Sequence, residues 1–398
     1  MKNMKILFVN ERPFNHLIGG IERVTDNLTR ELIKRGYEVY YLCGKVVEGD
    51  RCFLEYNIPV ELYVLPEDGL FSNETNIEYY KNLLEDKKID IVINQRGLSG
   101  LFNEILPITS TNLISVIHSI PDADIIAHNK GLLDLTVPPF VIIKKTIKRV
   151  LFPIIRAYWK KKDFLETRKK YNELALYSNA IVTLSKKCVD TMANFITIPN
   201  EAKIVSIPNP NSFRSSINYD KKEKVILYVG RLSKDDKNPM RLLYIWNRLY
   251  KKYQNWQLKI VGEGPEKNNM EKYVKEQQLK NVFFEGRQSD VAKYYREASI
   301  VCLTSDFEGW GMTLTEGMQY GCIPFTFNNY GAAFEIIDDG LNGCLIPAYN
   351  LKKYASRLSE LMSDENKRVE MSKAAMEKVK YFDVENVADQ WENLFRSL

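Results

Sequence analysis

Residues 305–324 read Ser-Asp-Phe-Glu-Gly-Trp-Gly-Met-Thr-Leu-Thr-Glu-Gly-Met-Gln-Tyr-Gly-Cys-Ile-Pro. Short apolar runs of strand length flank this stretch, at 298–303 before it and at 322–327 after it. We therefore predict a strand, a loop and a short helix that leads into a second strand. Two glycines of the loop, Gly309 and Gly311, free the backbone for unusual torsions and let a ligand approach closely.

The predicted helix of this stretch begins near Thr313, so its unpaired N–H groups and positive dipole end lie beside Glu308. Such a helix end is a ready binding site for an anion. Glu316 falls about one turn into the helix, where its carboxylate can accept hydrogen bonds from a polyhydroxylated ligand. The residues alone leave a second interpretation open, in which the acidic side chains merely cap a helix at an ordinary corner.

The two glutamates, with seven residues between them, resemble the signature of retaining glycosyltransferases of the GT-B fold. The glycines around them and Gly-Cys-Ile-Pro at 321–324 make the resemblance closest to family 4, which includes many capsule and lipopolysaccharide sugar transferases. This resemblance implies an α/β protein of two Rossmann-like, doubly wound domains that face each other across a cleft. It also implies a C-terminal helix that crosses back to the first domain. The residues of this stretch that it places at the nucleotide-sugar donor are Glu308, Gly309, Trp310, Gly311, Met312, Thr313 and Glu316.

The bulk composition is that of a globular protein. The chain has 398 residues, 45% apolar and 27% charged, which suits two domains and excludes a mostly disordered chain. Its six cysteines are scattered without a Cys-x-x-Cys pair, so we expect reduced core residues and neither disulfides nor a zinc site. The N-terminal apolar run is too short for a signal peptide, and no run approaches the ~20 residues that span a bilayer. These features predict a cytoplasmic protein.

The first predicted strand, 5–10, leads through Gly19 and Gly20 to Glu22 and to a helix that ends at Gly36. At this edge of a parallel α/β sheet, amide groups of a glycine loop can hold a ligand. The two glycines and the glutamate also match family 4. There the glycine backbone would lie against the donor phosphates, and Glu22 would face the acceptor. A plain turn is the other interpretation of the two glycines.

Further strand-like runs alternate with helical or loop segments, which predicts a parallel sheet with helices on both faces. These runs are 37–42, 60–65, 89–93, 112–117 and 179–184. His118 follows one of them, at the edge where ligands of open sheets collect. Members of family 4 often carry a histidine at this place that faces the donor sugar. A capping or core histidine is the alternative.

A second set of strands begins at 225–229 and is followed by Gly230, Arg231 and then Lys237. In family 4 a glycine-arginine and a later lysine bind the two phosphates of the nucleotide. Fixed cations at this place would stabilise the negative charge of the departing diphosphate. The spacing is one residue longer than the commonest form, so Lys234 is a rival, although the Asn-Pro that follows Lys237 favours Lys237. Solvated surface charge is the alternative.

Two more segments resemble the family. The strand and loop at 282–287 resemble the segment that lies against the nucleobase, which adds Arg287 to the donor residues, and Pro-Asn-Pro at 208–210 resembles the interdomain linker. We therefore expect an acceptor-side domain at 1–210, a donor-binding domain at 211–380 and a returning helix at 381–398.

Positive charge concentrates in one segment of the first domain. Between Lys144 and Lys170 the chain has eleven Lys/Arg and two Asp/Glu, a local charge of +9 in a chain whose total is +5. Trp, Phe and Ile are interleaved with these cations, and this composition suits an anionic lipid surface. We therefore predict peripheral contact of 141–170 with the inner membrane face, with a solvated helix face as the alternative. Nucleic acid could use the same charge, but no recognised module accompanies it, so it is not an expected partner.

A possible metal motif, Asp-Ala-Asp, lies at 122–124. Two such carboxylates can hold a divalent ion that bridges a nucleotide diphosphate. The second-domain cations supply the phosphate charge without a metal, so we expect a loop here, with no metal and no cofactor.

These features predict a metal-independent retaining glycosyltransferase that moves a hexosyl unit from a nucleotide diphosphate sugar to a glycan or lipid-linked acceptor in cell-surface polysaccharide synthesis. UDP is favoured over GDP in the donor. As the resemblance implies, catalysis would involve His118, Glu308, Arg231 and Lys237. A nucleotide-sugar epimerase of similar fold is one alternative, and it would invert the sugar without an acceptor. A non-catalytic glycan- or lipid-binding protein is the other, and it would have a damaged phosphate loop or glutamate pair, whereas both motifs are intact here.

Overall fold

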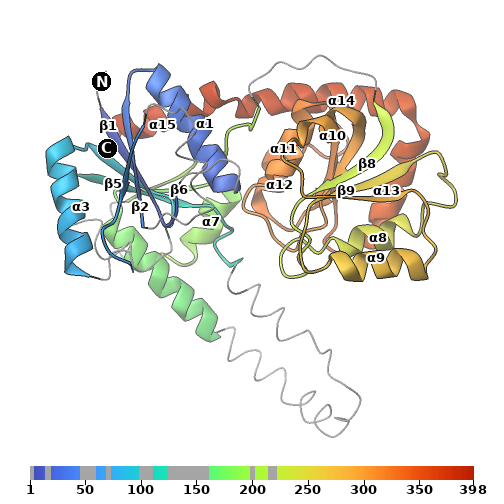
Figure 1. The fold of residues 1–398 in the computed structure, drawn as a ribbon, viewed down its shortest axis with the longest axis horizontal. Helices are drawn as coiled ribbons and strands as arrows, with labels where there is room; N and C mark the ends of the chain where they lie inside the picture. Colours follow the sequence, from blue (N-terminus) through green and yellow to red (C-terminus); the bar gives the residue numbers. More distant parts are fainter. Residues whose placement is uncertain are drawn as a thin grey trace, which may run out of the picture.

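Two α/β domains, each built on a parallel sheet, stand side by side (Figure 1). The computed structural model describes residues 4–13, 19–44, 60–68, 73–97, 111–123, 125, 161–197, 202–213 and 222–398. The N-terminal domain runs from blue to green in the figure, and the C-terminal domain from yellow to red. The predicted pair of Rossmann-like domains is confirmed.

The N-terminal sheet has seven strands within the described residues, in the order β3-β2-β1-β4-β5-β6-β7, and neighbouring strands are parallel. The strands are β1 (Lys5–Asn10), β2 (Glu38–Cys43), β3 (Glu61–Val64), β4 (Ile91–Asn94), β5 (Asn112–Ile117), β6 (Ala180–Thr183) and β7 (Lys203–Ser206). The helices with defined bounds are α1 (Gly20–Lys34), α3 (Glu74–Lys87) and α7 (Lys186–Ala193). The central strands are apolar runs buried on both faces, as expected of a parallel sheet covered by helices.

The C-terminal sheet has six parallel strands in the order β10-β9-β8-β11-β12-β13. The strands are β8 (Glu223–Val229), β9 (Gln257–Val261), β10 (Val282–Gly286), β11 (Ala298–Cys302), β12 (Ile323–Phe327) and β13 (Cys344–Ile346). The helices are α8 (Met240–Trp246), α9 (Lys267–Glu276), α10 (Ala292–Glu297), α11 (Met312–Gln319), α12 (Gly331–Ile336), α13 (Leu351–Ser363) and α14 (Glu365–Val379). The strand–loop–helix–strand unit predicted around 305–324 is confirmed as β11, α11 and β12.

Strand order reverses beside β1 in the first sheet and beside β8 in the second. Open α/β sheets bind their ligands outside the carboxyl ends of the strands at such a switch point. The loops that follow β1, β5, β8 and β11 carry most of the residues that the sequence assigns to the site. Topology therefore places those residues at the ligand-binding edge of each sheet.

The last helix, α15 (Val384–Arg396), follows the short 3₁₀ helix η3 (Lys380–Phe382) and belongs to the core of the N-terminal domain. Its apolar stripe, which includes Val387, Trp391 and Phe395, shares one hydrophobic cluster with Leu28 and Leu32 of α1. Figure 1 shows the red helix beside the blue α1. The predicted return of the C-terminus to the first domain is confirmed.

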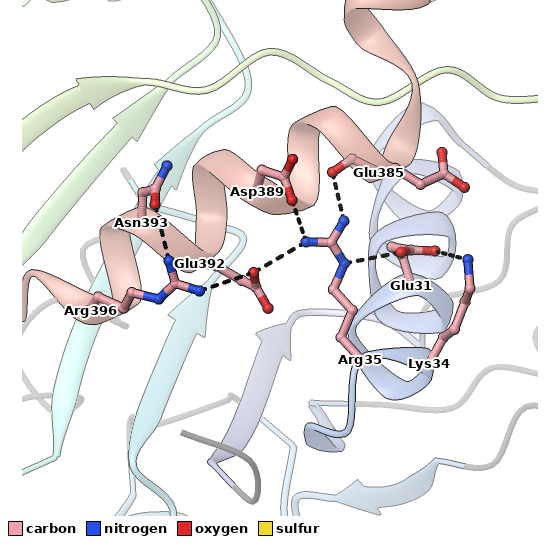
Figure 2. Close-up of polar contacts among 8 residues, drawn as sticks. All are labelled: Glu31, Lys34, Arg35, Glu385, Asp389, Glu392, Asn393 and Arg396. Atoms are coloured by element: carbon pink, nitrogen blue, oxygen red, sulfur yellow. Dashed lines mark hydrogen bonds and ion pairs between the residues drawn. The ribbon is translucent and has the colours of Figure 1, made fainter.

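A cluster of charged residues joins α1 to α15 (Figure 2). Arg35, directly after α1, donates from Nε to Glu31 at 3.0 Å and from Nη1 to Asp389 at 2.6 Å. Its Nη1 also contacts Glu392 at 3.2 Å, and Nη2 donates to the Glu385 carbonyl at 2.8 Å. One guanidinium thus joins the C-terminal end of α1 to two turns of α15.

The linker between the domains is fixed where the chain crosses back. The backbone N–H of Asn211 donates to the Phe382 carbonyl at 2.7 Å, and its side-chain amide donates to Val379 and Asp383, both at 2.8 Å. Asn27 of α1 donates in turn to the Asn211 carbonyl at 3.0 Å. Both crossings between the domains therefore meet at one buried asparagine.

Among the described residues, five cysteines are buried and form no disulfide, namely Cys43, Cys188, Cys302, Cys322 and Cys344. Within that same part of the chain, no helix combines the length and the apolar character needed to cross a bilayer.

Candidate active site

The site lies where the strand-end loops of the two domains meet. Gly309, in the loop after β11, packs against the backbone of His118, which follows β5, so closely that a Cβ on Gly309 would collide with the His118 carbonyl oxygen. Glycine is therefore required here because of the space, and the contact brings two predicted site residues together from opposite domains.

A second contact between the domains is an ordinary van der Waals approach of two helix ends. A Cβ on Gly20, the first residue of α1, would lie 3.7 Å from Cγ of Met312, the first residue of α11. The residue before α11, Gly311, has φ of 97°, a left-handed conformation that favours glycine and turns the chain into the helix. The start of α1 and the start of α11 thus lie beside each other.

Glu308 is held by a lysine of the same domain. Nζ of Lys237 lies 2.7 Å from each carboxylate oxygen of Glu308, and Oγ of Ser305 donates to Oε1 at 2.6 Å. The Glu308 side chain is 9% exposed and that of Lys237 is 25% exposed. Of the two rival lysines, Lys237 is the one beside Glu308, whereas Lys234 is an exposed residue.

The loop that carries Glu308 is fixed by residues that the sequence analysis missed. Arg241 of α8 donates to Asp306 at 2.7 Å and to the Thr304 carbonyl at 3.0 Å. Asn329, after β12, donates to the carbonyl of Asp306 at 2.6 Å. Asp306 was visible in the sequence as part of the loop, but no spacing connects it to Arg241 or Asn329.

Arg231 stands at the edge of the site with its charge partly balanced. Its Nη2 donates to Asp236 at 2.8 Å, and its side chain is 67% exposed. Burial opposes ionisation of Asp236, but hydrogen bonds from Ser233 and Arg231 outweigh it, so the pKa of Asp236 lies below its usual value. The exposed guanidinium can exchange this carboxylate for an anionic ligand, since surface pairs of this kind contribute little.

Glu316 forms an ion pair across the two domains. Its Oε1 accepts from Nη1 of Arg23 on α1 at 2.8 Å and from Oγ of Ser212 at 2.6 Å, while Oε2 accepts from the Tyr295 hydroxyl at 2.9 Å. The carboxylate is buried, and burial together with this charge raises the pKa of Tyr295 well above its usual value. Arg23 was not a predicted site residue, and it lies 293 positions from Glu316 in the chain.

His118 bonds to a glutamine of its own domain. Its Nε2 lies 2.5 Å from Oε1 of Gln95, which follows β4, and Nδ1 is buried without a hydrogen-bond partner among the described residues. Burial, and to a smaller extent the charge of Arg96, lowers the pKa of His118 to about 4. The ring is therefore neutral at neutral pH.

Glu22 lies in the first turn of α1 with its carboxylate folded back over Gly19, where an added Cβ would collide with it. A larger residue at position 19 would displace this flexible carboxylate, not the backbone. Thr313 donates from its hydroxyl to the Val229 carbonyl at 3.2 Å, which ties α11 to the end of β8 beside Gly230. Arg287 is an exposed residue directly after β10.

The predicted donor residue Trp310 has a buried side chain. The indole of Trp310 is 3% exposed and packs edge-on against Phe382 of η3, with ring centroids 5.0 Å apart. The side chain therefore belongs to the core beneath the loop, because a large apolar ring gains more from burial than from the cleft. The backbone of Trp310 lies in the loop between Gly309 and Gly311.

No group of three or more His, Cys, Asp or Glu side chains suited to a metal occurs among the described residues. Of the Asp-Ala-Asp motif, Asp124 lies outside the described residues. Asp122 is partly buried, and burial raises its pKa. Most of the basic segment, 141–160, also lies outside them.

Comparison with known proteins identifies the family. Residues 18–210 match the model of Glycosyltransferase Family 4, and residues 211–378 match the model of Glycosyl transferases group 1. The chain is a family 4 glycosyltransferase of the GT-B fold. One relative of this glycosyltransferase, an uncharacterized glycosyltransferase of Haemophilus influenzae, is 25% identical over 94% of this chain and 96% of its own length.

A second relative has a specific name. The GalNAc-alpha-(1->4)-GalNAc-alpha-(1->3)-diNAcBac-PP-undecaprenol alpha-1,4-N-acetyl-D-galactosaminyltransferase of Campylobacter jejuni is 30% identical. The match covers 46% of this glycosyltransferase and 52% of that protein, so the chain spans about half the length of this relative.

Solved structures share the whole fold. The Anabaena protein HepE in complex with UDP-glucose has a TM-score of 0.70 at 16% identity and covers 99% of this glycosyltransferase and 100% of its own chain. The lipopolysaccharide outer core galactosyltransferase WaaB has a TM-score of 0.70 at 20% identity, with 99% and 100% coverage.

Proposed function

We propose that this glycosyltransferase moves a hexosyl unit from a UDP-sugar to a glycan or lipid-linked acceptor in cell-surface polysaccharide synthesis, with retention of the anomeric configuration and without a metal ion. A GDP-sugar is the second candidate donor. The observation that carries the proposal is the contact of Gly309 with His118, because Gly309 directly follows Glu308, whose carboxylate Lys237 holds, and shortly precedes α11. This junction combines fixed cations, helix amides and a neutral imidazole from two facing domains.

Each of these groups suits one part of a nucleotide sugar. Arg231 and Lys237 bind the diphosphate, helped by the amides of α11 and the backbone of Gly19 and Gly20. Arg287 lies on the nucleobase side. The remaining contacts are Glu316 to the ribose, Glu308 and His118 to the sugar, and Glu22 to the acceptor.

In the reaction, the bond between the anomeric carbon and the diphosphate oxygen breaks, and the acceptor hydroxyl oxygen bonds to the same face of the sugar. The proton of that hydroxyl passes to an oxygen of the departing diphosphate. Arg231 and Lys237 stabilise the charge that develops on the leaving group. We infer that Glu308 acts as a binding group and not as a nucleophile, which the contact of Lys237 with both of its oxygens supports.

The names of the relatives support the choice of substrates. The Campylobacter relative acts on an undecaprenol-linked glycan, HepE was solved with UDP-glucose, and WaaB is a lipopolysaccharide galactosyltransferase. These names favour a UDP-sugar donor and a lipid-linked glycan acceptor for this chain.

The first test is thermal unfolding of the purified protein with a panel of UDP- and GDP-sugars. A donor present at about 100 times its Kd should stabilise the fold by about 2.7 kcal/mol. Transfer to lipid-linked glycans follows, with the anomeric configuration of the product read by NMR and with EDTA in a parallel reaction. Inversion of the donor sugar in the absence of acceptor, or complete loss of transfer in EDTA, would contradict the proposal.

Our proposal also places the enzyme at the cytoplasmic face of the inner membrane, in contact through 141–170. In the described part of this segment, the exposed residues Lys161, Lys162 and Lys169 lie with Leu165 on one side of a helix over 161–177. Each cation near an anionic surface contributes about 1 kcal/mol. Replacing the three lysines by Glu should abolish co-sedimentation with phosphatidylglycerol vesicles and leave transfer to a soluble acceptor intact. Unchanged co-sedimentation would remove the membrane contact from the proposal.

A further inference from the structure

The turn after β4 places one buried glutamine against the histidine of the site. The backbone N–H of Gln95 donates to the Val9 carbonyl of β1 at 3.0 Å, which continues the sheet by one residue. Gly97 ends the turn so close to β5 that a Cβ would lie 2.8 Å from the carbonyl oxygen of Val116. Gln95 itself is 4% exposed. The sheet therefore fixes the position of Gln95, independently of the loops around the cleft.

The bond between Gln95 and His118 decides which ring nitrogen carries the hydrogen. Oε1 of Gln95 lies 2.5 Å from Nε2 of His118, and an amide oxygen can only accept. A neutral imidazole has a single N–H, so hydrogen on Nε2 leaves Nδ1 as a bare acceptor. Nδ1 is buried and has no partner among the described residues. Buried polar atoms of this kind normally have a partner, which here a bound molecule can supply.

The surroundings keep the ring neutral. Arg96, next to Gln95, is the cation whose charge acts on His118, and it forms an ion pair of 2.8 Å with Glu11 after β1. On the side of the C-terminal domain, the backbone of His118 contacts Gly309. A neutral ring next to a cation resists taking up a proton but can still accept a hydrogen bond.

We propose that Gln95 is a positioning residue, which fixes His118 in the Nε2–H tautomer so that Nδ1 accepts a hydrogen bond from a hydroxyl of the donor sugar. The hydrogen bond from the donor sugar to Nδ1 rests on the proposed function, whereas the tautomer of His118 does not. Gln95 belongs to none of the motifs that resemble the family, and it acts only through His118.

The tautomer can be measured directly. The chain has three histidines, His16, His118 and His128, so long-range ¹H–¹⁵N correlation spectra of ¹⁵N-histidine protein contain at most three rings. The ring that disappears in His118→Ala is that of His118. At pH 7 it should show hydrogen on Nε2 and a bare Nδ1, and addition of a UDP-sugar that binds should shift the Nδ1 signal. Hydrogen on Nδ1, or an equal mixture of the two forms, in the wild-type protein would overturn the proposal.

Two variants separate positioning from a purely structural role. Gln95→Leu removes the acceptor, so the His118 ring should populate both tautomers and kcat should fall about tenfold, the worth of one hydrogen bond. Gln95→Glu keeps an acceptor but adds a charge, so the Nε2–H form should persist while the pKa of His118 rises by about 1–3 units. The acid limb of the pH–rate profile should move to higher pH by the same amount. Gln277→Leu, at an exposed glutamine of the second domain, is the control and should change neither spectrum nor rate.

The outcomes distinguish this inference from the proposed function. If the wild-type tautomer is Nε2–H and Gln95→Leu abolishes it, while no nucleotide sugar is turned over, the function is wrong and the positioning stands. If transfer is found and Gln95→Leu leaves the His118 spectrum unchanged, the function stands and the positioning is wrong.

Discussion

The ligand-binding edges of the two sheets carry different kinds of polar groups. In the C-terminal domain, the cations after β8 are paired with carboxylates of that domain: Arg231 with Asp236, Lys237 with Glu308 and Arg241 with Asp306. In the N-terminal domain, the buried residues at the strand ends are uncharged, namely Asn10, Asn94, Gln95 and the neutral ring of His118.

This difference indicates which domain receives which part of a substrate. Cations that already have a carboxylate partner are oriented before a phosphate arrives, so little reorganisation is needed when negative charge develops. Uncharged amides and an imidazole suit hydroxyl groups, which exchange hydrogen bonds without a change of charge. As part of the proposed function, we therefore assign the departing diphosphate to the second domain and the acceptor hydroxyl to the first, with the sugar between His118 and Glu308.

Loss of the central cation should have the largest effect. Lys237→Met leaves Glu308 without its cation and the diphosphate without a fixed charge, so kcat/KM for transfer should fall about 10²–10³-fold. The measurement is the initial rate of nucleotide release at saturating acceptor. Lys234→Met is the matched control and should stay within a factor of about two, because an exposed charge contributes little. If the two variants lost activity equally, the Lys237–Glu308 pair would be only structural.

Gly309→Ala tests whether the two edges must touch. The added Cβ collides with the His118 carbonyl, so the two domains must separate by part of an ångström or more. Because such a displacement misaligns the reacting groups, kcat should fall about 100-fold, while nucleotide binding to the second domain changes little. Equilibrium binding of UDP, compared with the transfer rate, checks the split. A parallel loss of UDP binding would mean that the collision disrupts the phosphate loop instead.

Local signals in the sequence predicted the elements of both domains well. The apolar runs at 5–10 and 112–117, predicted as strands, form β1 and β5 with the same bounds. The motif around Glu308 was also recognisable, because its glycines and glutamates are close in sequence.

Contacts between distant residues could not be predicted in this way. Arg23 and Glu316 belong to different domains, and nothing in the neighbourhood of either residue names the other. The same holds for Arg241 and Asp306, 65 positions apart. The side-chain direction of Trp310 depends on where η3 packs, so a motif alone could not show that its ring faces the core.

Arg23→Met tests an ion pair that joins the two edges. Glu316 keeps Ser212 and Tyr295 as donors but loses its cation, and Arg23 is one-third exposed, so the cost is moderate. We expect UDP affinity to fall about tenfold, with partial rescue in Arg23→Lys. Isothermal titration with UDP measures it. Tighter binding in Arg23→Met would instead mean that Arg23 competes with the nucleotide for Glu316.

The smallest effect on activity should come from the charged cluster of Figure 2, which lies between α1 and α15. Arg35→Ala removes three carboxylate contacts and one bond to a carbonyl, so the free energy of unfolding should fall by about 2 kcal/mol. Arg396→Ala is the control from the same cluster, because its contacts are 3.5 Å long and its side chain is 49% exposed.

Urea unfolding of both variants, together with UDP titration, measures the two quantities separately. Arg35→Ala should lose stability and keep UDP affinity within a factor of about two. Lys237→Met should lose UDP affinity and keep its stability, because Arg35 stabilises the fold whereas Lys237 binds the ligand. Loss of UDP affinity in Arg35→Ala would show that the position of α15 controls the cleft.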